Sequence, residues 1–368
     1  MPFPTGATGA TALRRMNQDT VTVAQLTEFD DIVDVRSPAE FAQDHIPGAM
    51  NCPVLDDEER ARVGTLYVQV SPFAARKIGA ALVARNIARH IEISLADKPR
   101  TWRPLIYCWR GGQRSAAICH VMRQIGWDAK RLAGGYNAYR HAVVAGIESL
   151  AEQFDYRVIC GLTGAGKSIL LQQLERLGAQ TLDLEQLAAH RGSVLGELPS
   201  EKQPSQKMLE SRLWRKLGSL DPRRPVFVES ESRKVGNLRV PEPLIARMWR
   251  SDCVWLETAL PLRVALLLRD YRHFTENAQA LCARLDCLVR LHGREKINGW
   301  KGKVAGAQWQ EFVTQILNEH YDLAYLKSIA RNYPKLDGAT RVRLTDGSDG
   351  DFERAARALL QPAFTETA

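Results

Sequence analysis

Short apolar runs alternate with longer amphipathic stretches along this chain. In its first part, the runs at 31–35 and 105–107 have the length and composition of buried strands, while apolar residues recur with helical spacing at 74–91 and 115–125. Strands that alternate with helices are typical of a parallel sheet. The first part therefore predicts an α/β domain, which we place at 15–140.

A second alternating unit follows a moderately polar helical stretch, which we interpret as a linker at 141–154. The predicted strands and helices of the second domain, at 155–368, follow in chain order: strand 156–160, helix 168–177, strands 181–184, 226–228 and 253–256, and helices 261–271, 276–291 and 308–331. The sequence thus predicts two α/β domains, of which the second ends in a helical part.

Composition narrows the class of protein. The 368 residues are 45% hydrophobic and 25% charged, which is ordinary for a globular protein and excludes a disordered chain. No run approaches about 18 uninterrupted apolar residues, which excludes a membrane span. The N-terminus lacks the basic and apolar regions of a signal peptide, so we expect a short flexible lead. Seven cysteines without C-x-x-C pairs support neither a disulfide framework nor a zinc ribbon, and they favour a cytoplasmic location.

Positive charge is concentrated in one window. The net charge is +8, and residues 202–250 alone carry twelve Lys and Arg against five Asp and Glu, a difference of +7. Trp214, Trp249 and Trp255 lie in or beside this window. Cations interleaved with aromatic rings suit a polyanion with stackable bases, and a solvated helix face is the alternative.

The segment GLTGAGKS between a predicted strand and a predicted helix has the spacing of a P-loop. Gly161, Gly164 and Gly166 let successive backbone N–H groups converge on phosphate oxygens, and Lys167 supplies a mobile cation. Ser168 is placed to reach a Mg²⁺ ion. The motif predicts a P-loop NTPase-like domain that holds a nucleotide or another diphosphate.

Polar residues after neighbouring strands are candidate partners of the P-loop. Glu229 ends the strand in PVFVES, and Glu231 and Arg233 follow it. Asp183 ends the strand in TLDL, and Arg191 lies in the polar loop HRGS. Acidic residues at such positions bind a metal ion or water, with a capping or surface role as the alternative, and an arginine suits a phosphate.

The segment CWRGGQRS is the second loop that contains candidate catalytic residues. Cys108 ends a buried strand, and Gly111 and Gly112 lead to a helix, with Arg110 and Arg114 on either side. Backbone N–H groups and a helix N-terminus stabilise a thiolate and bind an oxyanion. We therefore expect Cys108 to be a nucleophile of lowered pKa, against the alternative of a buried structural cysteine.

The first domain resembles a rhodanese-like domain over residues 19–140. The likeness rests on DVRSPAEF at 34–41, HIPGA at 45–49, the cysteine loop, and GGYNAY at 134–139. Common sulfurtransferase loops have one residue fewer between the cysteine and the arginine. The C-x5-R spacing from Cys108 to Arg114 occurs in phosphatases of this fold, and we expect the wider loop to admit a group larger than one sulfur atom.

The order of the motifs along nearly the whole chain resembles the tRNA 2-selenouridine synthase family, in which a rhodanese-like domain is fused to a P-loop domain. The resemblance implies a bacterial enzyme that converts 2-thiouridine at wobble position 34 of tRNA to 2-selenouridine. It implies geranylation of the sulfur with geranyl diphosphate, followed by replacement with selenium from selenophosphate. No tightly bound cofactor is implied, apart from Mg²⁺ with the diphosphate.

The candidate residues fit this two-step scheme. The P-loop residues would stabilise the departing pyrophosphate, and Cys108 would carry selenium as a selanylsulfide while Arg110, Arg114 and the amides of Gly111 and Gly112 hold the phosphoryl group. The expected macromolecular partner is the anticodon region of tRNA, and selenophosphate must be supplied. The cations that we expect to contact tRNA phosphates are Arg215, Lys216, Arg223 and Arg224.

Other interpretations remain open from the sequence. One is a different tRNA sulfur or selenium transferase. Another is a phosphatase-like or ATPase fusion, in which Cys108 takes phosphate, although the loop offers no Asp as the acid that phosphatases need. A third, an RNA-binding regulator without catalysis, would be favoured by loss of Cys108, which is present.

Overall fold

The computed structural model describes residues 19–361. The predicted N-terminal lead, the first residues of the predicted domain at 15–140, and the end of the second domain at 362–368 lie outside the described residues. The chain forms two compact units. One runs up to Gly146 and includes Glu210–Arg212, and the other takes the remainder.

The first unit contains a five-stranded parallel sheet in the order β1-β5-β4-β2-β3. Its strands are β1 (Thr20–Val21), β2 (Asp31–Asp34), β3 (Met50–Asn51), β4 (Pro104–Tyr107) and β5 (Lys130–Leu132). Its helices are η1 (Val23–Glu28), α2 (Pro38–Gln43), α3 (Asp57–Gln69), α4 (Pro72–Ile93), α5 (Gln113–Ile125) and α6 (Gly135–Ala151). The predicted parallel-sheet fold is confirmed.

The middle strand of this sheet, β4, explains where the cysteine loop lies. All four of its residues are buried, as expected for a strand with helices on both faces. It pairs with β2 from Asp31 opposite Pro104 to Asp34 opposite Tyr107. Because parallel strands end at the same edge of a sheet, the polar residues after β2 and the loop after β4 share one edge.

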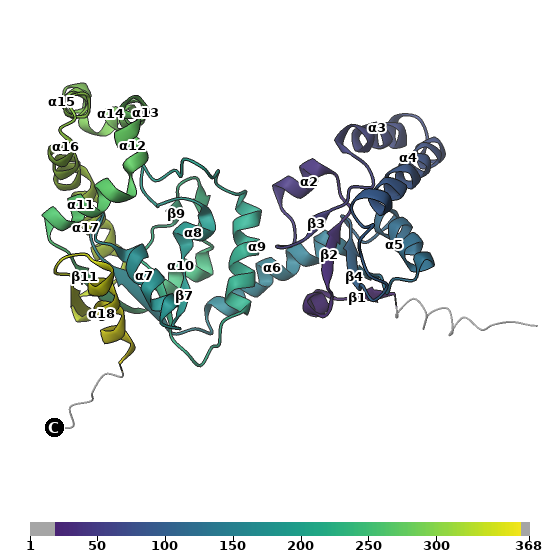
Figure 1. The fold of residues 1–368 in the computed structure, drawn as a ribbon, viewed down its shortest axis with the longest axis horizontal. Helices are drawn as coiled ribbons and strands as arrows, with labels where there is room; N and C mark the ends of the chain where they lie inside the picture. The colour runs from purple at the N-terminus through teal and green to yellow at the C-terminus, as the bar shows by residue number, and fades with distance from the viewer. Residues whose placement is uncertain (1–18, 362–368) are drawn as a thin grey trace, which may run out of the picture. The chain divides into compact units, whose positions relative to one another are not determined.

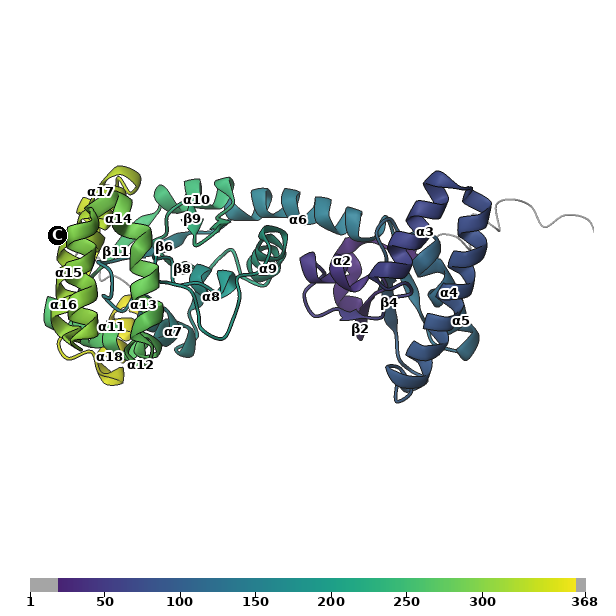
Figure 2. The ribbon, with the colours of Figure 1, turned by 90° about the horizontal axis from the view of Figure 1, so that it is seen from above.

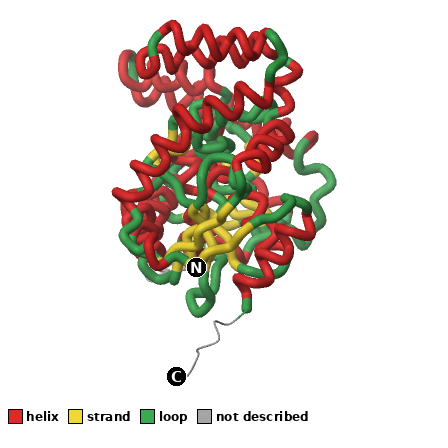
Figure 3. The backbone as a smooth tube through the Cα atoms, turned by 90° about the vertical axis from the view of Figure 1, so that its left-hand side faces the viewer, coloured by secondary structure: helices red, strands yellow, loops and turns green. Residues whose placement is uncertain are grey.

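The second unit has its own five-stranded parallel sheet in the order β12-β11-β6-β8-β7. Its strands are β6 (Tyr156–Cys160), β7 (Gln180–Leu182), β8 (Val226–Glu229), β11 (Asp252–Glu257) and β12 (Thr340–Arg343). A separate antiparallel pair joins β9 (Lys234–Val235) and β10 (Leu238–Arg239). The strands lie between layers of helix (Figure 3).

The helices of the second unit fall into two groups. Those that accompany the sheet are α7 (Lys167–Arg176), α8 (Leu184–Ala188), α9 (Gln206–Gly218), α10 (Glu242–Trp249) and α18 (Asp349–Leu360), and α18 packs beside α7 (Figure 1). The helical part comprises α11 (Leu260–Asp270), α12 (Arg272–Glu276), α13 (Ala278–Leu285), η2 (Asp286–Leu288), α14 (Val289–His292), α15 (Arg294–Ala305), α16 (Trp309–Ile316), η3 (Leu317–Tyr321), α17 (Asp322–Asn332) and η4 (Leu336–Gly338). In Figure 2, α13, α15 and α16 lie together in one layer.

The P-loop lies where the strand order of this sheet reverses. Strand β6 is central, with β8 on one side and β11 on the other. Such a switch point opens a crevice beyond the carboxyl ends of the strands, where α/β proteins bind ligands. The loop after β6 therefore begins in the position that the fold favours for a binding site.

Two of the helices predicted for the second domain differ from the sequence-based expectation. The stretch 276–291 is not one helix, because Asn277 ends α12 and caps α13 through its side chain, and a 3₁₀ turn follows. The stretch 308–331 is helical but contains the π-helical segment η3. Among the described residues, no helix is both long and apolar enough to cross a bilayer.

Candidate active sites

The loop that carries Cys108 runs directly from β4 into α5. Cys108 is 2% exposed, and its Sγ lies 3.2 Å from Ser115 Oγ, in the first turn of the helix. Gly112 occupies the N-cap position of α5 and offers no side-chain acceptor to the first-turn amides. A helix that begins in this way leaves its N-terminal N–H groups for an anion. The cysteine thus has a hydroxyl partner and a helix N-terminus beside it.

Glycines keep this loop close to its neighbour, the turn after β5. A Cβ on Gly135 would lie 2.3 Å from the Cys108 carbonyl oxygen and 2.5 Å from the Gly111 nitrogen, so no larger residue fits there without a shift of backbone. Gly111 itself has φ +66, a conformation that favours glycine. The Tyr136 N–H donates to the Cys108 carbonyl at 2.8 Å. The contacts of the GGY motif therefore hold the backbone of the cysteine loop in place.

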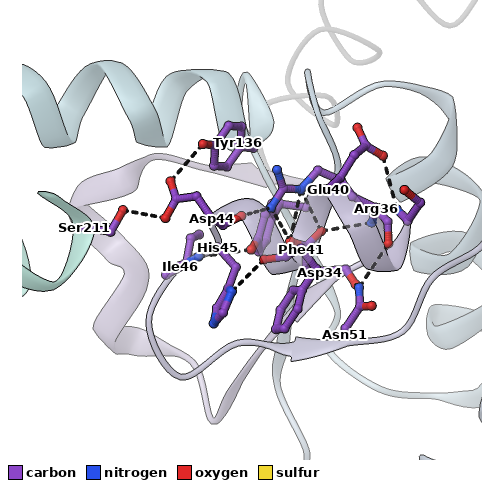
Figure 4. Close-up of polar contacts among 12 residues, drawn as sticks. Asp34, Arg36, Glu40, Phe41, Asp44, His45, Ile46, Asn51, Tyr136 and Ser211 are labelled. Carbon is purple, nitrogen blue, oxygen red and sulfur yellow. Dashed lines mark hydrogen bonds and ion pairs between the residues drawn. The ribbon is translucent and has the colours of Figure 1, made fainter. Parts of the chain in front are cut away.

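A buried ion pair supports the same edge of the sheet (Figure 4). Arg36 donates to both carboxylate oxygens of Asp34, and both side chains are almost fully buried. The guanidinium also donates to the Asp44 carbonyl and lies 4.0 Å from the centre of the Tyr136 ring. Tyr136 in turn donates its hydroxyl to the Asp44 carboxylate at 2.8 Å. Residues of the DVRSPAEF and GGY motifs, together with Asp44 directly before HIPGA, thus form one network at this edge of the sheet.

The two loop arginines are placed differently. Arg114 donates to both oxygens of Glu40, at 2.8 and 3.4 Å, and both side chains are largely buried. Burial acts to raise the pKa of Glu40, but the hydrogen bond and charge of Arg114 hold that pKa below its usual value. Arg110 is exposed at the loop. An anion that enters the loop would meet Arg110, whereas Arg114 is engaged by a carboxylate.

The P-loop has the geometry that its glycines predict. Gly164 and Gly166 have φ +78 and +92, and a Cβ on Gly166 would lie 2.6 Å from the Phe352 ring. Lys167 Nζ donates to the Gly161 carbonyl at 2.9 Å. Ser168 Oγ donates to Glu185 Oε2 at 2.9 Å. The loop is thus formed, with its cation and hydroxyl held by its own neighbours.

Carboxylates gather beside the P-loop. Glu229 is buried, and its Oε1 accepts the N–H groups of Leu184 and Glu185 at 2.5 and 2.9 Å, while its Oε2 has no partner among the described residues. Burial, followed by the charges of Asp183, Glu185 and Glu231, raises the pKa of Glu229 well above its usual value. Glu229 therefore positions the start of α8, which carries Glu185.

Glu231 and Glu185 are the carboxylates of this group that line the cavity in front of the P-loop. Burial and the neighbouring Glu185 charge raise the pKa of Glu231 to about 8, although Lys167 acts in the opposite direction. Burial also raises the pKa of Glu185 itself. Clustered carboxylates with raised pKa values in a cavity are typical of a functional site.

A large cavity opens in front of the P-loop, with a volume of about 1,440 Å³ including its mouth. Of the sequence-based candidates, it brings together Gly164, Gly166, Lys167, Ser168, Arg191 and Glu231. Asp183 instead caps α8 by accepting the Gln186 N–H at 2.7 Å. Arg233 pairs with Glu242 and lies 5.0 Å from the Trp249 ring, outside the cavity lining.

Comparison with known proteins assigns both units. The profile described as "tRNA 2-selenouridine synthase AAA domain" matches residues 154–288, and the rhodanese-like domain profile matches residues 10–142. A tRNA 2-selenouridine synthase from Nitrosomonas europaea is 32% identical over 82% of this chain and 83% of its own length. This chain belongs to the tRNA 2-selenouridine synthase family.

Two further family members show the same relationship. The tRNA 2-selenouridine synthase of Pseudomonas fluorescens is 36% identical over 72% of this chain and 70% of its own length. That of Marinobacter nauticus is 38% identical over 65% of each chain. The family assignment confirms the predicted architecture, a rhodanese-like domain followed by a P-loop domain.

The P-loop pocket of this family member fits a Mg²⁺ ion only in company with phosphate. Among residues 19–361, no group of three His, Cys, Asp or Glu side chains is arranged to hold a metal ion. Ser168 Oγ and the Glu185 carboxylate supply two adjacent oxygens. Mg²⁺ is commonly held by one or two protein oxygens, substrate phosphates and water. The residues present therefore fit Mg²⁺ that arrives with a diphosphate.

The four predicted tRNA-contacting cations lie at the other edge of the sheet from the P-loop. Arg223 and Arg224 precede the first residue of β8, and Arg224 donates to the carbonyl of Gly178 after α7. Lys216 pairs with Glu175 in the last turn of α7 at 3.3 Å, and the neighbouring Arg215 is exposed. Arg223 pairs with Asp221 at 2.9 Å but remains 88% exposed. This cationic group is separate from the cavity.

The structure adds residues that the sequence did not single out. Tyr325 accepts the Gly161 N–H at 2.9 Å through its hydroxyl, and its ring centre lies 5.2 Å from Lys167 Nζ. Arg263 donates to the Thr163 carbonyl at 2.9 Å and pairs with Asp322 at 2.6 Å. The partners in these contacts are far apart in sequence, so no local pattern could have revealed them.

Proposed function

We propose that this chain is a tRNA 2-selenouridine synthase that first geranylates and then selenates 2-thiouridine at the wobble position of tRNA. One observation carries the proposal: a formed P-loop that faces a large cavity and a cysteine loop at a helix N-terminus occur in one member of this family. The first site suits a diphosphate, and the second suits covalent transfer of a small group.

In the first step, the 2-thio sulfur attacks C1 of geranyl diphosphate, the C1–O bond breaks, and pyrophosphate leaves. Lys167 and the loop amides stabilise the charge that develops on the leaving group. A Mg²⁺ ion held by Ser168 and Glu185 would neutralise part of the diphosphate charge. The uridine loses its N3 proton when sulfur is alkylated, and Glu231, which lines the cavity, is placed to accept it when ionised.

In the second step, the Cys108 sulfur bonds to selenium and the Se–P bond breaks, which leaves the electron pair on phosphorus. The selanylsulfide selenium then attacks C2 of the geranylated base and expels geranylthiol, and a thiol reductant frees the product from Cys108. Ser115 can donate to the Cys108 thiolate, and Arg110 can meet the selenophosphate anion. The phosphorus product of this route is phosphite, which phosphorus NMR distinguishes from phosphate.

A phosphatase-like function is the second candidate, and the contacts of Arg114 argue against it. That reaction requires the loop arginine to hold the phosphoryl group in a bidentate manner. Arg114, the arginine at the C-x5-R position, already uses two of its nitrogens for Glu40.

The test is mass spectrometry of nucleosides from 2-thiouridine tRNA. Incubation with geranyl diphosphate alone should yield S-geranyl-2-thiouridine, and addition of selenophosphate with a thiol should convert it to 2-selenouridine. Formation of 2-selenouridine without geranyl diphosphate would contradict the two-step order. ATP in place of geranyl diphosphate is the matched control, and it should give no product.

A further inference from the structure

A second cavity lies beside the P-loop cavity, within the helical part of the second unit. Its volume is about 550 Å³ including its mouth, and its lining is almost entirely apolar. The lining comes mainly from α11, α12, α13, α16 and η3. Residues that belong to this cavity alone include Leu268, Phe274, Leu281, Trp309, Phe312 and Val313. Binding sites for organic ligands have predominantly apolar linings of this kind.

The cavity interrupts an otherwise packed apolar cluster. Phe274, Leu281 and Phe312 belong to one buried cluster of the helical part, and each is at most 6% exposed. Protein interiors are normally filled, with few voids larger than a water molecule, and an empty apolar cavity destabilises the fold. A hollow lined by these aromatic and aliphatic side chains is therefore a candidate site for an apolar ligand group.

The apolar cavity and the P-loop cavity share a wall. The shared residues are Thr163, Ser193, Leu267, Tyr271 and Tyr321. Leu267 abuts the P-loop itself, because a Cβ on Gly164 would lie 2.7 Å from the Leu267 side chain. A ligand headed by a phosphate in the P-loop thus has an apolar space next to its head.

The junction between the two cavities is held in place by polar contacts. Arg263 joins the P-loop carbonyl of Thr163 to Asp322 at the start of α17. Arg191 lies 4.6 Å from the Tyr271 ring centre and donates to the Asp270 carbonyl. A cation therefore stands where the polar cavity meets the apolar one, as a diphosphate joined to a hydrocarbon requires.

We propose that the apolar cavity binds the hydrocarbon tail of the prenyl diphosphate whose head occupies the P-loop. This inference rests on the proposed function and names the residues that select the alkyl group. The tail leaves the P-loop past Leu267 and Tyr271 and enters the space between α13 and α16. Trp309 and Val313 on α16 and Leu281 on α13 then limit the length of chain that fits.

Binding should depend steeply on the tail. Burial of one methylene is worth about four-fold in affinity. Loss of a five-carbon isoprene unit, from geranyl to dimethylallyl diphosphate, should therefore weaken binding on the order of 10²- to 10³-fold. Inorganic pyrophosphate, which has only the head, should bind more weakly still.

The decisive variant is Val313→Phe, which fills the cavity. Val289→Phe is the matched control, because Val289 packs against the same cluster but does not line the cavity. Calorimetry on the full chain should show at least about ten-fold weaker binding of geranyl diphosphate to Val313→Phe and unchanged binding of pyrophosphate. Val289→Phe should bind both as the wild type does. Thermal melting should show that Val313→Phe and the wild type are both folded. If Val313→Phe then prefers geranyl diphosphate to pyrophosphate as strongly as the wild type does, the inference is overturned.

A second variant enlarges the apolar cavity. Because it is expected to gain affinity for a longer ligand, a loss of folding cannot produce the expected result. Trp309→Ala should raise the affinity for the fifteen-carbon farnesyl diphosphate relative to geranyl diphosphate by several-fold. An unchanged ratio would also overturn the assignment. If the wild type itself does not prefer geranyl diphosphate to pyrophosphate, the proposed function fails together with the inference. If the wild type geranylates tRNA but Val313→Phe binds geranyl diphosphate as the wild type does, the inference fails and the proposed function stands.

Discussion

The cysteine loop and the P-loop have the same backbone arrangement but different surrounding side chains. Each follows a buried central strand, β4 or β6, and leads into a helix, α5 or α7. Each depends on glycines with positive φ, Gly111 in one and Gly164 with Gly166 in the other. This arrangement places backbone N–H groups and a helix N-terminus around an anion in both units.

The surroundings of the two loops separate their tasks. Around Cys108, charges are paired: Arg36 with Asp34, and Arg114 with Glu40. Around Lys167, carboxylates are crowded and unevenly paired, and they border a cavity of about 1,440 Å³ next to an apolar one. Paired charges give a rigid loop that suits a small anion and a covalent step, whereas an open cavity suits a large substrate whose charge changes.

Substitution of the nucleophile gives the largest expected effect and tests whether the two loops act separately. Cys108→Ser should lower selenation by about 10³-fold or more, because a serine hydroxyl cannot carry selenium, and it should leave geranylation intact. Geranylated tRNA should then accumulate in nucleoside mass spectrometry. Cys119→Ser, at another buried cysteine, is the control. Near-normal 2-selenouridine from Cys108→Ser would show that Cys108 is not the carrier.

Loss of the P-loop cation should have the converse effect. Lys167→Ala should slow geranylation by about 10²-fold, because the pyrophosphate leaving group loses a charge partner. Selenation of tRNA that is already geranylated should stay within about two-fold of wild type. Rates of each step, measured separately, provide the check, with Lys77→Ala on the surface of α4 as control. Equal loss of both steps in a folded variant would argue for a shared site.

Local patterns were sufficient to predict both loops and the strands that precede them. The strand at 156–160 and the glycines of both loops follow from residues close in sequence, and the structure places them as predicted. Strands β1, β3 and β5 were missed because each has only two or three residues, too few for a recognisable apolar run. Strand β12 was missed because its residues are mostly exposed and polar. The partners Glu40 of Arg114 and Tyr325 of the P-loop were missed because only the tertiary fold brings them close.

The pairing of Arg114 can be broken directly. Glu40→Ala removes the carboxylate that holds the guanidinium, so the arginine should become mobile and selenation should fall by about ten-fold. Geranylation should not change. Glu58→Ala, an exposed acid on α3, is the control. Single-turnover selenation is the measurement, and an unchanged rate would assign the Arg114–Glu40 pair to folding alone.

The crowding of carboxylates at the P-loop should appear in the pH dependence of stability. The folded pKa of Glu231 is raised to about 8, so the folded state binds more protons than the unfolded state between the two pKa values. Its contribution to stability is present at acidic pH and is lost as the pH rises from about 4.5 towards 8. Glu231→Gln should therefore be at least about 1 kcal/mol more stable than wild type near pH 8, with a shallower dependence on pH. Urea unfolding at pH 5 and pH 8 tests this, and Glu148→Gln is the control. Identical slopes for Glu231→Gln and wild type would contradict the raised pKa.

The smallest expected effect concerns the cations that lie away from both loops. If Arg223 and Arg224 contact tRNA phosphates, Arg223→Glu with Arg224→Glu should weaken binding of all tRNA sequences alike and lower the slope of log affinity against log salt. Each lost contact should change that slope by about 0.7 to 0.9. The pair Arg215→Glu with Lys216→Glu should act in the same way, while the exposed pair Arg76→Glu with Lys77→Glu on α4 controls for net charge. Because these cations lie at the edge of the sheet opposite the P-loop, geranylation at saturating tRNA should be unaffected. Unchanged slopes in a salt titration of both double variants would mean that this surface is only solvated, and the cations of residues 284–303 would be the next to reverse.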